Sequence, residues 1–229
     1  SGTTSVTNLT DAINLGTIST TALTIDASGV LTQSGVSTVS GDSSFSAGAN
    51  LINLNLANDF QGAVSLSNSG GNDVTITTAN ALDLGTVGVG QNLTVNAGGT
   101  ISDSGIVSVA GSTTLDNAGA DAAILLDSAS TYTGNVTFTT DAGSDVTITD
   151  NSAFAIQSGL NVSNLSITST GAVSDLGNID IDGSLTVSAV GQAIDLSGAG
   201  ANDITGDITL NGASAVSYTH LRAHETSRN

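Results

Sequence analysis

Cysteine, proline, methionine and tryptophan are all absent from this 229-residue chain. Without cysteine no disulfide framework can form. Only 3% of the residues are aromatic and 10% are charged, which excludes a compact globule built on large aromatic side chains. Disorder is not expected either, because 38% of the residues are hydrophobic and most of these are Val, Ile, Leu or Ala. The length suits one sizeable domain.

Basic residues are almost absent too. Residues 1–215 contain 19 Asp but no Lys, Arg, His or Glu, which gives this part of the chain a net charge of −19. Such a surface repels phosphate and anionic lipid, so we expect no nucleic-acid or membrane-surface partner. Nucleophilic triads need His or Cys, zinc sites need N or S ligands, and a phosphate-binding P-loop needs Lys. We therefore interpret Gly85-Thr-Val-Gly88-Val-Gly90 as a turn and not as a phosphate cradle.

Targeting segments are not visible. No basic and apolar leader follows Ser1, and no run approaches the ~18–20 apolar residues of a membrane-spanning helix. We expect an internal fragment of a longer chain, with no membrane insertion.

The last residues have a different composition. Residues 216–229 hold both Arg, both His and the single Glu of the chain. The stretch from Val216 to Thr226 resembles the conceptual translation of a transposon-type sequencing adapter. We expect 216–229 to be a non-native, disordered tail, with a real basic extension as the alternative. The cluster that looks most like a catalytic site is therefore set aside: Tyr218, His220, His224 and Glu225.

The rest of the chain repeats with a period of about 72 residues. Asp73-Val-Thr-Ile-Thr77 matches Asp145-Val-Thr-Ile-Thr149. A second phrase occurs three times: Phe60-Gln-Gly-Ala-Val-Ser-Leu66, Tyr132-Thr-Gly-Asn-Val-Thr-Phe138 and Ile204-Thr-Gly-Asp-Ile-Thr-Leu210. Long-period self-similarity is typical of solenoids and related arrays. We place the units at 1–70, 71–143 and 144–215, within one domain that spans 1–215.

Within each unit, apolar residues alternate with small polar ones, as in Val74/Ile76, Leu93/Val95 and Val107/Val109. A period of two predicts short strands with one inward row of side chains, and no segment shows a sustained helical period. A 72-residue unit divides into three or four coils of about 18–24 residues. The sequence therefore predicts an all-β fold, a parallel β-helix (β-solenoid) of roughly ten coils stacked at ~4.8 Å.

Asn and aromatic residues have recurring places. Phe60, Tyr132 and Phe138 stand where other units have Leu or Ile, which predicts packing in the core or at its rim. Asn recurs near expected turns at five positions: Asn53, Asn55, Asn72, Asn92 and Asn96. These side chains either form ladders between stacked coils or simply favour turns.

Three phrases carry a resemblance to a known family: Asn58-Asp-Phe-Gln-Gly-Ala-Val64, Asn80-Ala-Leu-Asp-Leu-Gly85 and Leu93-Thr-Val-Asn-Ala-Gly-Gly-Thr-Ile101. They resemble the repeat region of filamentous-haemagglutinin-like exoproteins, which are large adhesins of Gram-negative bacteria. The resemblance implies a right-handed coil, export by two-partner secretion through an outer-membrane transporter, and a secreted, cell-surface location. It also implies a role in cell adhesion, with host-cell or matrix glycans or proteins as partners of the parent molecule.

The best candidate for a metal site is Asn178-Ile-Asp-Ile-Asp-Gly183, which matches the start of a calcium loop except at its first position. The twelfth position is Ala189, where a calcium loop needs a bidentate Glu. In the counterpart 106–111 the apolar Val107 and Val109 persist, whereas the acidic residues do not. We interpret the stretch as a strand with outward Asp and predict no metal site.

Paired carboxylates suggest glycoside hydrolysis at Asp141, Asp145 and Asp150, or at Asp121 and Asp127. Nothing in the sequence marks one carboxyl of a pair as the acid, and a polysaccharide lyase would need the cationic help that 1–215 lacks. We predict no catalytic residue, no cofactor and no enzymatic activity. The two leading hypotheses are a structural stalk segment of a secreted adhesin and a glycan- or protein-binding module of a biofilm or calcium-stiffened surface-layer protein.

Overall fold

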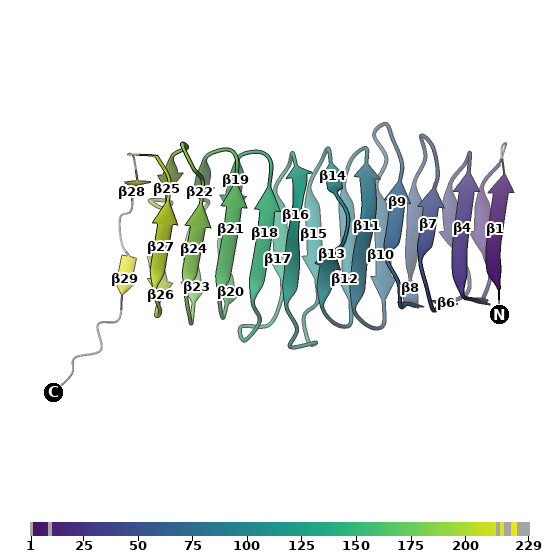
Figure 1. Ribbon diagram of the computed structural model, residues 1–229, viewed down its shortest axis with the longest axis horizontal. Helices are drawn as coiled ribbons and strands as arrows, with labels where there is room; N and C mark the ends of the chain where they lie inside the picture. Colours follow the sequence, from purple (N-terminus) through teal and green to yellow (C-terminus); the bar gives the residue numbers. More distant parts are fainter. Residues whose placement is uncertain (1, 9–10, 214–215, 218–220, 224–229) are drawn as a thin grey trace.

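The computed structural model describes residues 2–8, 11–213, 216–217 and 221–223. Its strands stand side by side along a rod, roughly perpendicular to the long axis (Figure 1). The prediction of an all-β chain is confirmed, because the described residues form strands and no helix. In the described part of the chain there is accordingly no helix long and apolar enough to cross a membrane.

Each coil has three strand positions, which we number first, second and third in chain order, and neighbouring coils pair in parallel. The first strands are β1 (Thr3–Asn8), β4 (Ala22–Ala27), β7 (Ser43–Ser46), β9 (Val64–Ser67), the second half of β11 (Leu82–Val89), β14 (Val107–Val109), the second half of β16 (Ile124–Tyr132), β19 (Phe154–Ile156), β22 (Val173–Asp175), β25 (Ile194–Asp195) and β28 (Val216–Ser217). The second strands are β2 (Ile13–Leu15), β5 (Leu31–Gln33), the first half of β8 (Ile52–Phe60), β10 (Val74–Thr78), β12 (Leu93–Ala97), β15 (Thr113–Asp116), β17 (Val136–Thr139), β20 (Leu160–Val162), β23 (Ile179–Ile181), β26 (Asn202–Ile204) and β29 (Leu221–Ala223). The third strands are β3 (Ile18–Thr20), β6 (Ser37–Val39), the second half of β8, the first half of β11, β13 (Ile101–Asp103), the first half of β16, β18 (Val146–Asp150), β21 (Leu165–Ser169), β24 (Leu185–Ser188) and β27 (Ile208–Asn211).

One repeat unit does not fill a whole number of coils. The first unit contains β1 to β9, and β8 pairs with β5 through its first half and with β6 through its second half, so the unit supplies ten strand positions. With three positions to a coil, each unit advances by three coils and one third. The opening strand of the unit is therefore a first strand in β1, a second strand in β10 and a third strand in β18. Three units complete about ten turns, as the sequence predicted.

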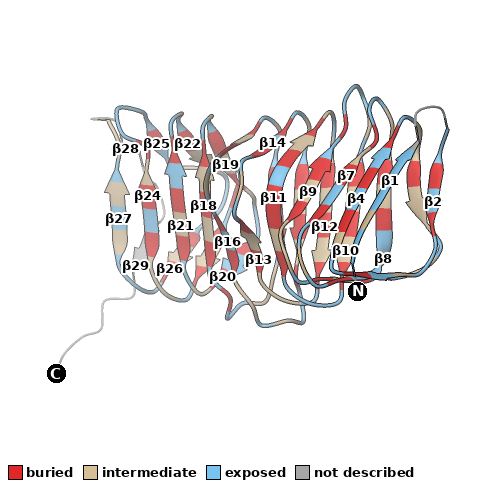
Figure 2. Ribbon diagram, turned by 45° about the vertical axis from the view of Figure 1, so that its right-hand side comes forward, coloured by how far each residue is buried: buried red, intermediate tan, exposed pale blue. Residues whose placement is uncertain are grey.

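The core is a narrow aliphatic column. Inward and outward residues alternate along most strands (Figure 2), and Val74 and Ile76 are fully buried whereas Thr75 between them is not. The buried apolar side chains form one cluster that runs from Ile13 to Ile204. The aromatic side chains belong to it as predicted: Phe60, Tyr132 and Phe138 are buried. No single coil can bury its inward row of apolar side chains. Stacking joins the rows of successive coils into one continuous core.

Glycine permits the closest contact between coils. A Cβ at Gly134 would lie 2.6 Å from the carbonyl oxygen of Gly111 in the coil before it. The same pairing occurs one unit upstream between Gly41 and Gly62, and one unit downstream between Gly183 and Gly206. This explains why glycine follows Gln61, Thr133 and Thr205 in the repeated phrase: any side chain there would strike backbone, which cannot move aside.

Residues 216–229, expected to be a disordered tail, fall mostly outside the described part of the chain. Within them, β28 pairs with β25 and β29 pairs with β26. An open strand edge offers unpaired backbone groups to any extended segment beside it, which accounts for this pairing. The origin of the tail and the right-handed sense of the coil stay predictions.

Candidate functional site

A surface hollow of about 390 Å³ lies where the first unit meets the second. It separates the second half of β8 from the first half of β11, between Asp59 and Asp83. Asp59 is already engaged there: Asn80 Nδ2 donates to its Oδ1 at 3.1 Å and Gln61 Nε2 donates to its Oδ2 at 3.3 Å. The hollow is therefore lined by two carboxylates and two amides, with no cation, imidazole or thiol.

The chemistry open to this hollow is limited. Carboxylate and amide oxygens are the ligands that calcium prefers. However, no group of three or more His, Cys, Asp or Glu within the described ranges is placed to hold a metal ion. The hollow can accept hydrogen bonds through its carboxylate and amide oxygens.

A second set of polar groups lies inside the coil. In the third unit, Asn202 Nδ2 donates to Asp175 Oδ2 at 2.8 Å, and the backbone N–H of Ile179 donates to Asn202 Oδ1 at 3.1 Å. Asn202 is 1% exposed and Asp175 is 8% exposed. We call this arrangement, an inward polar side chain that accepts a backbone N–H of the previous coil and bonds a polar side chain there, the corner brace.

The corner brace recurs once in each unit. In the second unit, Ser130 Oγ donates to Asp103 Oδ2 at 3.4 Å. In the first unit, Asn58 and Gln33 exchange two hydrogen bonds of 3.0 Å each. The backbone donors are Ser37, Val107 and Ile179 in turn, at 2.9, 2.9 and 3.1 Å. A buried N–H without a partner costs about 1–3 kcal/mol. The brace avoids this cost by accepting the N–H groups at corners that strand pairing does not reach.

Burial alters the proton affinity of three side chains in the second and third units. Burial raises the pKa of the Asp103 carboxyl, and the N–H of Ser128 partly offsets this by hydrogen bonding. The pKa of Asp150 is likewise raised by burial, against hydrogen bonds from the Tyr132 N–H and from Ser152. The pKa of the Tyr132 hydroxyl is raised by burial and then by the charge of Asp103.

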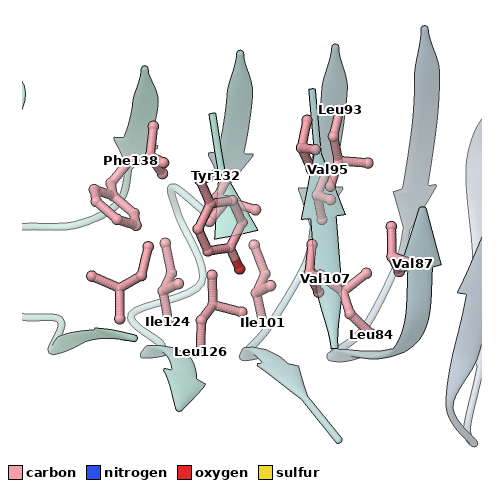
Figure 3. Packing of buried hydrophobic residues seen from close by; sticks show 14 of the residues in the cluster. Leu84, Val87, Leu93, Val95, Ile101, Val107, Ile124, Leu126, Tyr132 and Phe138 are labelled. Carbon is pink, nitrogen blue, oxygen red and sulfur yellow. The ribbon is translucent and has the colours of Figure 1, made fainter. Parts of the chain in front are cut away.

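All three side chains are buried. Figure 3 shows the ring of Tyr132 among Ile101, Ile124 and Leu126, and its hydroxyl has no hydrogen-bond partner within the described residues. Asp150 is only 1% exposed. Their shifted pKa values therefore bear on the pH dependence of folding.

Within the candidate calcium stretch 178–183, residues Ile179–Ile181 form strand β23 and a bend follows them. Ile179 and Ile181 of β23 are buried, whereas Asp180 between them faces outward and Asp182 is exposed. A calcium loop needs to wrap its ligands around one point, which an extended strand does not do. The two carboxylates thus lie outside the core on a regular coil.

The carboxylates considered for glycoside hydrolysis support turns and coils. Asp141 Oδ2 accepts the N–H of Asp121 at 2.8 Å and of Gly119 at 2.9 Å. These two bonds lower the pKa of Asp141. They also fix the turn in which Asp121 has a φ of 48°, a conformation that few residues other than glycine adopt. Asp145 Oδ1 accepts Asn164 Nδ2 at 2.8 Å, between neighbouring coils.

At Asn92 a ladder of hydrogen bonds runs from coil to coil, but its partners are an Asp side chain and backbone and not the stacked amides that we expected. Asn92 Nδ2 donates to Asp73 Oδ1 at 2.9 Å, and its Oδ1 accepts the N–H of Ser112 at 2.9 Å. The same three-coil ladder recurs one unit later, through Asp145, Asn164 and Ser184. Asn72 is a turn former instead, because its Nδ2 donates to the Ser69 carbonyl at 2.9 Å within the turn.

One interpretation was wrong. Gly85–Gly90, expected to be a turn, lies mostly within β11. The chain bends at a corner there without leaving the extended conformation, because glycine fits the tight space beside Ser65 Oγ, where a Cβ at Gly85 would come within 2.8 Å.

The corner brace was not among the features predicted from the sequence. A signal was present: polar residues occupy one inward position at intervals of 72, as Asn58, Ser130 and Asn202. A polar residue in an otherwise apolar inward row indicates a buried hydrogen bond.

A continuous core, stacked parallel coils and side chains bonded from coil to coil define the class, which is a repeat β-solenoid protein. The chain belongs to the family described as "Repeats of unknown function (DUF5649)", whose model matches residues 1–67, 71–140 and 143–211. These matches fall within the three units derived from the sequence, except that the third match begins one residue earlier, at 143. No match was found among curated proteins or among solved structures.

Proposed function

We propose that the chain is a structural segment of the stalk of a secreted bacterial surface adhesin, which holds a distal binding region away from the cell. One observation carries this proposal. A single apolar cluster runs from Ile13 to Ile204, and side chains of three successive coils are bonded to one another outside it. A scaffold needs such a continuous core with bonds from coil to coil, whereas an enzyme needs reactive groups at a hollow.

The finer parts of the proposal follow from the resemblance to filamentous-haemagglutinin-like exoproteins. In this proposal the parent molecule is exported by two-partner secretion, with an outer-membrane transporter as a transient partner. It stands at the surface of a Gram-negative bacterium and contacts host-cell or matrix glycans or proteins. The segment itself is not an enzyme. Its net charge of −18 supports solubility and opposes lateral association of rods.

The alternative function is a binding module of a biofilm or surface-layer protein. The acidic hollow between Asp59 and Asp83 favours it, because it is the kind of polar depression in which a ligand could rest. The two functions predict different behaviour of the isolated full chain.

A binding screen separates them. The full chain, labelled at an introduced cysteine at the exposed Thr139, is applied to a glycan array and to immobilised matrix proteins. The stalk proposal predicts no saturable binding. Saturable binding that Asp59→Ala or Asp83→Ala abolishes, while Asp182→Ala does not, would overturn the stalk proposal in favour of a binding module.

A further inference from the structure

Backbone pairing between coils is interrupted near the junction of the second and third units. The coil of β16, β17 and β18 is followed by the coil of β19, β20 and β21. Of the three possible stacks between them, only β18 and β21 are paired within the described residues, over Val146–Asp150 and Leu165–Ser169. The sheet that contains β17 ends there, and β19 and β20 each begin a new sheet.

Side chains replace the missing strand partners. Gln157 presents its amide to Phe138 like a peptide group: the Phe138 N–H donates to Gln157 Oε1 at 2.5 Å, and Gln157 Nε2 donates to the Phe138 carbonyl at 2.9 Å. At the neighbouring interruption, the Tyr132 N–H donates to Asp150 Oδ1 at 3.1 Å, and Ser152 Oγ donates to the Tyr132 carbonyl at 3.3 Å. A hollow of about 210 Å³ lies beside Gln157, between β17 and β20.

In the described part of the chain, the backbone bonds found across the two interruptions lie at their margins. Asn151 N–H donates to the Ser130 carbonyl at 2.7 Å, and Ser163 N–H donates to the Ser144 carbonyl at 2.9 Å. The first lies at the end of β18, where Ser130 is paired with Asp150, and the second lies next to a turn. The two interruptions therefore depend on side-chain bonds and on the packing of core residues.

The first junction is different. There the coil of β7 and β8 is followed by that of β9, β10 and the first half of β11. Two stacks stay paired, β7 with β9 over four residue pairs and β8 with β10. Only the third stack is interrupted, at the hollow beside Asp59. The chain therefore contains its own control: one junction with two paired stacks and one with a single paired stack.

We infer that the junction between β18 and β21 is a hinge of the rod. The paired strands β18 and β21 form its axis, and the interrupted stacks beside β19 and β20 open when the rod bends. Strands paired along a whole sheet resist separation together, whereas the bonds of Gln157, Asp150 and Ser152 can be lost one at a time. Bending is concentrated at this junction, and the coils on either side keep their pairing.

Hydrogen exchange tests the hinge in the native chain. Segment 134–140 contains Phe138 and is compared with its counterpart 62–68 in the first unit, where β9 is paired on both sides. We expect amides in 134–140 to exchange faster. Gln157→Ala should raise the amide exchange rate of 134–140 further, by about fivefold for the loss of one net hydrogen bond. Gln91→Ala, at an exposed position, should leave that exchange rate unchanged. Equal exchange of the two segments in the native chain would overturn the hinge.

Spin labels test the motion itself. The chain has no cysteine, so labels are placed at Thr94→Cys and Asp180→Cys, which span four strand steps across the hinge. The control pair, Thr32→Cys and Thr114→Cys, spans four steps along paired strands. Both mean distances should be near 20 Å at ~4.8 Å per step. The hinge predicts a broader distribution for the first pair, and equal widths would contradict it.

Discussion

Asn202 Nδ2 lies 2.8 Å from Asp175 Oδ2 inside the coil, and the two residues are 27 positions apart in the chain. The pair joins neighbouring coils at a corner. Ser130 and Asp103 repeat the relationship one unit earlier, again 27 positions apart. A buried polar pair at a fixed place in each unit links the coils in one register, because a shift of the chain by one residue would turn it outward.

The corner brace should be needed for stability. Asn58→Ala leaves the Ser37 N–H and the Gln33 amide without their buried partner, which should lower the free energy of unfolding by about 2–3 kcal/mol. Asn58→Ser, which copies the second unit, should cost less. Asn53→Ala, at an outward position, should change stability by under ~0.5 kcal/mol. Urea unfolding measures all three, and equal midpoints would show that the brace is dispensable.

Stacked glycines should tolerate no side chain. A Cβ at Gly134 meets the Gly111 carbonyl at 2.6 Å, so Gly134→Ala should destabilise the chain by about 1–3 kcal/mol through forced separation of two coils. Gly88→Ala is the matched control, since a Cβ there meets nothing within 4 Å. It should be neutral or slightly stabilising. If both variants have the same melting temperature, the close contact of Gly134 with Gly111 does not limit the stability of the chain.

Stability should depend on pH through Asp150. Burial raises the pKa of its carboxyl, so the folded chain binds the proton more tightly than the unfolded chain. Its contribution is complete below the ordinary pKa of 3.8 and is lost as pH rises through the raised value. Asp150→Asn cannot ionise and keeps an acceptor for the Tyr132 N–H. The variant should therefore gain stability relative to the native chain as pH rises from about 3 to about 7.

Asp195 is the control, because its pKa is shifted in the opposite direction to that of Asp150. Hydrogen bonds from the Ser197 hydroxyl and N–H lower its pKa, so its contribution is present at neutral pH and lost as pH falls through the lowered value. Asp195→Asn should lose stability relative to the native chain as pH rises. Urea titrations at each pH measure both differences. The explanation by burial fails if Asp150→Asn follows the trend of Asp195→Asn.

Calcium should have no effect on the chain. Asp180 faces outward from β23, Asp182 is exposed just after that strand, and Asp59 is already bonded to two amides. We expect neither heat in a calorimetric titration nor a rise in melting temperature at millimolar calcium. A clear rise that Asp180→Asn abolishes would instead support a calcium-stiffened surface-layer protein.

The repeat period and the alternation of residues were sufficient to predict the fold. Val74 and Ile76 show both features, and both side chains are fully buried. The polar contacts were harder to foresee, because their partners lie in different coils and the chain between them varies in length. Gln33 and Asn58 are 25 positions apart, whereas Asp103 and Ser130 are 27 apart. Pattern along the chain shows which residues point inward, but it does not show which of them meet.

The hinge illustrates the same difficulty. In the sequence, Gln157 is only the residue that stands 72 positions after Gly85. In the structure its side chain takes the place of a strand. The sequence does not indicate this role for a glutamine among turn residues. The role exists because β17 and β20 are not paired with each other.

The central claim is that each unit adds three coils and one third to a straight stack, so that any unit can follow any other. Small-angle X-ray scattering tests it on a chain into which a second copy of residues 72–143 is inserted after residue 143. We predict a long dimension increased by about 16 Å, at ~4.8 Å per coil, with an unchanged radius of gyration of the cross-section. An increase of the cross-section with no increase in length would contradict the account.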